Sequence, residues 1–162
     1  MKFVVYYRTE RHMAKSLERT QPLSVLDRRY LFYGTGNMED VRRICTHNFD
    51  ESASAERDTK YGSGVCFSRD ATFSDIFTEG PTGFMFLADV LVGQFARGER
   101  GYRRPPPLTG LRADQHDSCV NTLYNPNIFR VFEKNQYYPA YLIKCTDNRG
   151  FINMVYKRTH TK

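Results

Sequence analysis

The sequence contains no tryptophan, no Cys-x-x-Cys pair and no long apolar run, although it has 12 phenylalanines and 11 tyrosines. No apolar run approaches the roughly 20 residues that a membrane-spanning helix needs. The apolar start at Met1–Val5 is too short for a signal peptide. We therefore expect a soluble intracellular protein, cytoplasmic or nuclear, without a membrane partner.

The four cysteines are too far apart for a zinc site. Cys45, Cys66, Cys119 and Cys145 are widely spaced, and His47 near Cys45 has no second half-site at zinc-ligand spacing. Reduced core thiols in a reducing compartment are the expectation, and no metal is expected.

The composition that is present fits one globular domain over residues 1–162, with 40% hydrophobic and 26% charged residues. The net charge of +6 favours phosphate-bearing partners. However, the basic pairs are scattered along the chain: Arg28-Arg29, Arg103-Arg104 and Lys157-Arg158. Because they form no aromatic-plus-basic stripe, a nucleic-acid-binding module is the weakest of the functions considered.

Helices are expected early in the chain and strands later. An amphipathic pattern predicts a helix over residues 3–17, and Asn37 is expected to cap a second helix over 38–49 with acidic residues in its first turn. The predicted strands cover residues 30–33, 65–67, 84–95, 119–123, 128–133 and 137–145, with a weaker strand at 151–156. Pro139 indicates an edge strand or a bulge. This order predicts an α+β fold around a mostly antiparallel sheet.

The stretch 61–77 combines backbone freedom with two chemically useful side chains. Gly62 and Gly64 allow close approach of a ligand or a second chain segment. A helix beginning after Asp70 would place Ser74 and Phe77 on one face, where a hydroxyl and a ring could hold a flat polar group. An ordinary strand-to-helix corner with a core phenylalanine is the alternative.

Several motifs together resemble the catalytic domain of poly(ADP-ribose) polymerase (PARP)-like ADP-ribosyltransferases, in family order over residues 30–145. They include Leu31–Thr35, Tyr61–Gly64, Ala71–Ser74, Phe86–Gly93, Asp117–Val120 and Gln136–Pro139. The nearest resemblance is to the mono-transferase branch with the CCCH zinc-finger antiviral protein and the dioxin-inducible PARP. It implies a split, mainly antiparallel sheet with flanking helices, and NAD as substrate. It also implies that the strand usually ahead of the first helix is missing here.

The resemblance implies that four positions hold NAD. The backbone of Gly34, with Thr35 beside it, would bind the nicotinamide amide. The hydroxyl of Ser74 would support that amide, and the ring of Phe77 would stack on nicotinamide where the family usually has tyrosine.

The three catalytic positions that the resemblance implies carry unusual residues. Tyr33 stands in place of a histidine that bonds the adenosine ribose, and we expect its hydroxyl to enter the ribose volume. Cys66 replaces a tyrosine and leaves one wall of the nicotinamide slot open. Ile128 replaces a glutamate, so the negative charge beside the ribosyl cation is lost. These losses are expected to weaken NAD binding by about a hundredfold, on the order of 3 kcal/mol.

We therefore expect a degenerate transferase domain, with NAD binding and transfer weak or lost and no polymer synthesis. Such a domain would be a pseudo-enzyme module of an antiviral or RNA-regulatory protein, associated with RNA only through a longer parent chain. The alternative is an active mono-ADP-ribosyltransferase that modifies protein acceptors. If Tyr33 and Cys66 disable a shared slot, Tyr33→His together with Cys66→Tyr is expected to restore NAD binding.

Overall fold

The computed structural model describes residues 27–50, 59–72, 82–108, 115–148, 151–152 and 155–158. The predicted helix over 3–17 lies outside these residues. So do Ser74 and Phe77, and all but the first two residues, Ala71 and Thr72, of the helical turn expected after Asp70. In the described part of the chain, no helix is long and apolar enough to cross a membrane.

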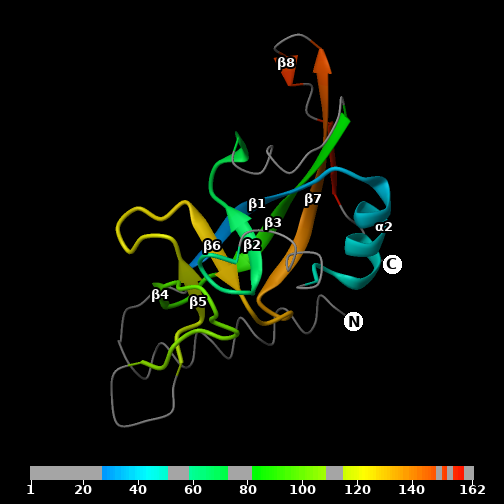
Figure 1. Ribbon diagram of the computed structural model, residues 1–162. Helices are drawn as coiled ribbons and strands as arrows, with labels where there is room; N and C mark the ends of the chain where they lie inside the picture. Colours follow the sequence, from blue (N-terminus) through cyan, green and yellow to red (C-terminus); the bar gives the residue numbers. More distant parts are fainter. Residues whose placement is uncertain are drawn as a thin grey trace.

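Strands dominate the described residues (Figure 1), as the sequence predicted. The elements are β1 Arg28–Thr35, α2 Met38–His47, β2 Val65–Ser68, β3 Thr82–Leu91, β4 Phe95–Arg97, β5 Ser118–Val120, β6 Ile128–Val131, β7 Tyr137–Asn148, β8 Phe151–Ile152 and β9 Val155–Arg158. The strand order is β4-β5-β6-β2-β1-β3-β7-β8, with β9 also on β7. All pairs are antiparallel except β4–β5, so the expected α+β fold with a mainly antiparallel sheet is confirmed.

The apolar run 84–95 was predicted as one strand and is in fact two. β3 ends at Leu91 and β4 begins at Phe95, with Gly93 between them at φ 59°. A Cβ added at Gly93 would lie 2.2 Å from Oδ2 of Asp117, so both the backbone angle and the space require glycine here. A turn at one glycine is hidden in a run whose polar side chains are Asp89 and Gln94 alone.

Other predicted strands differ at their ends. The strands predicted over 119–123 and 128–133 stop at Val120 and Val131, and the weak strand over 151–156 is two short strands, β8 and β9. The bulge expected at Pro139 is confirmed: Leu87 pairs with Tyr141 while Ala88 pairs with Pro139. The bulge lets a proline sit in a strand that has neighbours on both sides.

The sheet consists of two parts that meet through little pairing. β1 pairs with β3 over its full length, whereas Phe32–Ser68 is the one register pair between β1 and β2 in the described residues. One part of the sheet is β4-β5-β6-β2 and the other begins with β1-β3-β7. The split expected in the sheet therefore lies between β1 and β2.

The capping of α2 matches its prediction. The side chain of Asn37 accepts a hydrogen bond from the backbone N–H of Asp40 at 2.7 Å, and Glu39 and Asp40 occupy the first turn. The helix ends two residues earlier than predicted because Asn48 turns into the left-handed region at φ 71°. The amide of Asn48 then donates to the backbone oxygens of Lys134 and Tyr137, which fixes the end of the helix at the start of β7.

The core is an aromatic cluster on one face of the sheet. Phe49 lies at its centre, with its ring centroid 4.9–5.7 Å from four others, and the members are Tyr33, Phe49, Phe67, Phe86 and Tyr137. Val41 and Ile44 of α2 are buried in the same cluster. Each tilted or edge-on ring pair contributes about 0.5–1.5 kcal/mol beyond the area it buries. This cluster joins the two parts of the sheet where hydrogen bonds are few.

Candidate functional site

Gly34 and Cys66 lie near each other where β1 and β2 separate. Phe32 and Ser68 are opposite each other in the pair that joins these antiparallel strands. Two residues further along β1 is Gly34, and two residues back along β2 is Cys66, at the same end of the pair. Since side chains alternate along a strand, the Cys66 side chain points to the same face of the sheet as a side chain at position 34 would.

Ile128 and Arg130 lie on that same face. In the β2–β6 pair, Ile128 is opposite Ser68 and Arg130 is opposite Cys66. Ile128 is 4% exposed and Arg130 is 2% exposed, and a guanidinium nitrogen of Arg130 donates to the backbone oxygen of Gly64 at 3.1 Å. Neither β2 (VCFS) nor β6 (IFRV) contains a carboxylate. Beside Cys66, this face therefore carries a buried cation and, on these two strands, no negative charge.

Arg130 was not among the site residues predicted from the sequence. The signal was an arginine in an otherwise apolar strand, two residues after the position of the family glutamate. Because residues i and i+2 of a strand share a face, that spacing alone places the cation on the face of Ile128.

Tyr33 points away from this face. Its ring is 2% exposed, with its centroid 4.9 Å from Phe49 and 6.0 Å from Phe67. Phe67 and Cys66 are consecutive in β2 and point to opposite faces of the sheet. The expectations that the Tyr33 hydroxyl enters the ribose volume, and that Tyr33 and Cys66 face one ligand, are therefore corrected: Tyr33 belongs to the aromatic core.

Thr35 is buried, and its hydroxyl is bonded to the first turn of α2. The hydroxyl donates to a carboxylate oxygen of Asp40 at 3.0 Å, and Arg43 donates to the other oxygen of Asp40 at 2.8 Å. The side chain of Thr35 thus fixes α2 to the end of β1. A contact between NAD and the backbone of Thr35 remains a prediction.

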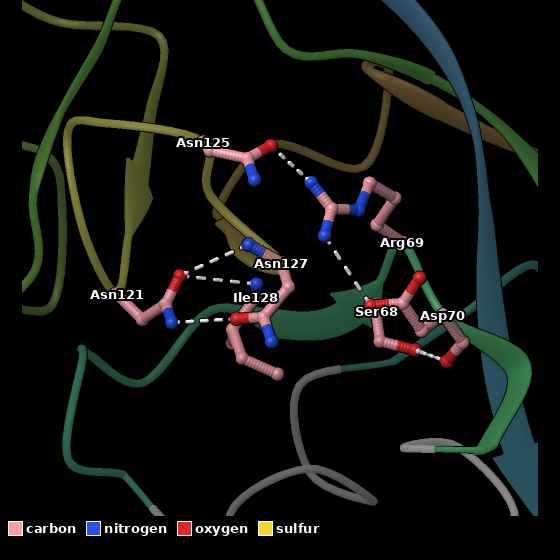
Figure 2. A network of polar contacts seen from close by, with 7 residues as sticks. All are labelled: Ser68, Arg69, Asp70, Asn121, Asn125, Asn127 and Ile128. Carbon is pink, nitrogen blue, oxygen red and sulfur yellow. Dashed lines mark hydrogen bonds and ion pairs between the residues drawn. The ribbon is translucent and has the colours of Figure 1, made fainter.

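The loop between β5 and β6 is bound to the end of β2 by polar contacts (Figure 2). The side-chain oxygen of Asn121 accepts from the backbone N–H groups of Asn127 and Ile128, both at 3.2 Å. The backbone N–H of Arg69 donates to the backbone oxygen of Asn127 at 2.9 Å. The Arg69 guanidinium donates to the side-chain oxygen of Asn125 (Figure 2). These contacts determine where Ile128 enters β6.

Neither Cys119 nor a cluster of metal ligands forms a second site among the described residues. Burial raises the pKa of Cys119 to about 11, so its thiol stays protonated at neutral pH. Among the residues that the structure describes, no group of three or more His, Cys, Asp or Glu side chains is placed to hold a metal ion.

This split sheet, with a glycine where its parts separate, is the architecture of an ADP-ribosyltransferase domain. Residues 4–147 match the family model for the poly(ADP-ribose) polymerase catalytic domain, so the chain belongs to that family and the resemblance is confirmed.

Three curated relatives are mono-ADP-ribosyltransferases by name. The chain is 44% identical to human protein mono-ADP-ribosyltransferase PARP12 over 123 residues, which is 75% of this chain and 17% of the relative. It is 34% identical to mouse PARP11 over 149 residues, 78% of this chain and 45% of the relative. It is 35% identical to mouse PARP10 over 120 residues, 71% of this chain and 12% of the relative. The chain therefore spans less than half the length of these relatives.

Proposed function

We propose that this domain is a degenerate member of the mono-ADP-ribosyltransferase family, in which NAD binding and transfer are weak or lost. The observation that carries the proposal is that Ile128 and Arg130 of β6 lie on the same face of the sheet as Cys66. Ile128, at the position of the family glutamate, is apolar. The nearest charged residue in β6 is Arg130, whose charge is positive where the glutamate would be negative.

The sign matters because cleavage of the nicotinamide bond develops positive charge on the ribose. Ile128 and Arg130 are two strand residues apart, about 6.6 Å at 3.3 Å per residue. The Arg130 guanidinium is bonded to the backbone oxygen of Gly64, so a positive group is held near the strand positions opposite Cys66. A cation that develops beside residue 128 would be disfavoured by this charge, in addition to the loss of the carboxylate.

The described residues fit NAD only in part. Gly34 and Cys66 are small residues, each two positions from the register pair that joins β1 and β2, but Cys66 offers no ring to stack on nicotinamide. When bound, NAD would supply the ADP-ribosyl group. Since neither β2 nor β6 offers a carboxylate to stabilise its transfer, we derive no chemical step at this site.

A transfer assay with labelled NAD tests the proposal directly. We expect no labelled band on this chain or on added acceptor proteins, and no ladder of ADP-ribose polymer at high enzyme and NAD. Ligand-detected NMR measures residual NAD affinity, and Ser74→Ala is the matched variant, because loss of residual binding would identify the predicted nicotinamide contact. A single labelled band that nicotinamide suppresses would overturn the proposal.

A double-mutant cycle tests the electrostatic argument separately. Ile128→Glu places a buried carboxylate two residues from Arg130 on the same face of β6. We expect Ile128→Glu to destabilise the protein more when Arg130 is also replaced by methionine, with a coupling of about 1–3 kcal/mol in urea unfolding. Zero coupling would mean that the charge of Arg130 does not reach position 128, and the wrong-sign argument would fail.

An active mono-ADP-ribosyltransferase is the second candidate, favoured by the names of the relatives and by the 44% identity to PARP12. Under this candidate, Gly34, Ser74 and Phe77 suffice for a weak site and protein side chains are the acceptors. The labelled-NAD assay separates the two candidates, since only the active enzyme gives a nicotinamide-sensitive band. Both candidates include a cytoplasmic or nuclear location and indirect association with RNA through a longer parent protein.

A further inference from the structure

Two segments far apart in the sequence form one surface at the β4 end of the sheet. The backbone N–H and the hydroxyl of Ser63 donate to the backbone oxygen of Tyr102 at 2.8 and 3.2 Å. A Cβ added at Gly98 would lie 2.3 Å from the backbone oxygen of Tyr61, so these segments are in close contact. Figure 1 shows β4 and β5 on the opposite side of the molecule from α2.

This surface, which we call the basic face, has five exposed cations around two half-buried tyrosines, Tyr61 and Tyr102. The cations are Lys60, Arg97, Arg100, Arg103 and Arg104. Glu99 is the one carboxylate in the two segments 60–63 and 97–104. The structure gives no ion pair to the four arginines within the residues it describes. Among the residues that the structure describes, the basic face therefore presents four arginines and one carboxylate, Glu99.

The basic face is hollowed beside Tyr102. A depression of about 630 Å³ is lined by residues 101–107 and Gln115, including Arg103 and Arg104. The backbone N–H of His116 donates to the oxygen of Pro106 at 3.1 Å, and Nδ1 of its ring lies 2.9 Å from the same oxygen. Pro107 also pairs with Gln115. The wall of the depression is thus held in place by contacts within the protein.

We propose that the basic face binds single-stranded nucleic acid, an activity separate from the NAD site. Exposed arginines suit phosphates, and aromatic rings in the same segments suit unstacked bases, which is the combination that sequence-tolerant single-strand binders use. The rings favour this partner over a lipid surface or an acidic peptide, since neither presents bases to stack. Lys60 lies over the Tyr61 ring at 5.4 Å, so cation and ring are already adjacent on this face.

Little in the sequence indicates this face, because its residues come from segments about 40 positions apart. Arg103-Arg104 is one short basic pair, and Lys60 and Tyr61 stand far before it. Only the contacts among Tyr61, Ser63, Gly98 and Tyr102 bring rings and cations together.

The test is fluorescence anisotropy with the full 162-residue chain and a labelled 12-nucleotide oligouridylate, without NAD. If three phosphates are neutralised, log Kobs is expected to fall with log salt at a slope of about −2 between 50 and 200 mM. A 12-nucleotide oligothymidylate is expected to bind within a few-fold of the RNA, and a 12-base-pair duplex at least tenfold more weakly. Equal affinity for the duplex would remove the stacking argument and overturn the proposal.

Matched variants locate the binding. Arg103→Glu with Arg104→Glu is expected to lower affinity at least tenfold, and Tyr102→Leu about tenfold, whereas Tyr102→Phe keeps the ring and is expected to bind normally. The control is Arg42→Glu with Lys144→Glu, two exposed cations outside the basic face with the same change in net charge. Circular dichroism and thermal melting show whether each variant is folded. No binding by the folded wild-type chain, or equal loss in test and control variants, would overturn the proposal.

Discussion

Replacing Tyr33 by histidine tests whether this residue lines a ligand slot or belongs to the aromatic core. If the residue lined a ligand slot, Tyr33→His would restore the family residue and favour NAD binding. The structure instead places the ring in the core, 4.9 Å from Phe49 and 6.0 Å from Phe67 between centroids. We therefore expect Tyr33→His to destabilise the fold without any gain in NAD affinity.

The magnitude follows from the lost contacts. Two tilted ring pairs, with Phe49 and Phe67, contribute about 0.5–1.5 kcal/mol each beyond area. Burying an imidazole in place of the phenol ring adds about 1–3 kcal/mol. The expected loss is therefore about 4 kcal/mol, which lowers Tm by roughly 8–16 °C in a domain of this size.

Urea unfolding at several pH values provides the assay. A buried imidazole at position 33 must stay neutral, so its folded-state pKa lies below the unfolded value of about 6.5, and the variant loses further stability as pH falls through that value. Tyr33→Phe is the matched control, with an expected change within about 1 kcal/mol. Because Tyr33 and Cys66 point to opposite faces, the energies of Tyr33→His and Cys66→Tyr are expected to add. A stable, pH-independent Tyr33→His protein that binds NAD would refute the core placement.

Three further variants test the backbone and one buried carboxyl. Gly93→Ala is expected to cost about 2–4 kcal/mol in urea unfolding, from a positive φ and a clash with Asp117; an unchanged midpoint would contradict the tight turn. Burial raises the pKa of Asp117, so its ionisation costs stability as pH rises through that pKa. Asp117→Asn is therefore expected to raise Tm at pH 7 but not below the unfolded-state pKa, and a lower Tm at pH 7 would count against this. Asn121→Ala is expected to lower the free energy of unfolding by about 1–3 kcal/mol, because two backbone N–H groups lose their acceptor. A decrease below about 0.5 kcal/mol, the lower end for one hydrogen bond, would show that water replaces the side chain.

Local signals predicted the elements where one side chain decides the geometry. Asn37 was expected to cap α2 and does so, and Pro139 was expected at a bulge and lies in one. The apolar run through Gly93 was predicted as one strand because hydrophobicity does not show backbone angles. The carboxyl that excludes a side chain there belongs to Asp117, 24 positions away.

Site residues were harder to predict because a motif assigns a position but not a direction. We expected Tyr33 to point in the same direction as the family histidine and, because its ring is larger, to reach further into the ligand site. A phenol ring buries more apolar area than an imidazole, and the rings of Phe49 and Phe67 offer it a place in the core. Arg130 was overlooked for the opposite reason, since no motif position drew attention to it.

The two faces of the sheet carry different groups of residues. Cys66 and Ile128 share a face with Gly34, apart from the aromatic cluster, so substitutions at these predicted site positions leave the ring contacts of the cluster intact. Tyr33 is different, because its ring contributes to the cluster that joins the two parts of the sheet where β1 and β2 share one register pair. A return to histidine at this position would therefore have to be accompanied by repacking around Phe49 and Phe67. By this reasoning, Cys66→Tyr leaves the aromatic cluster unchanged, whereas Ile128→Glu buries a carboxylate and Tyr33→His requires the cluster to repack.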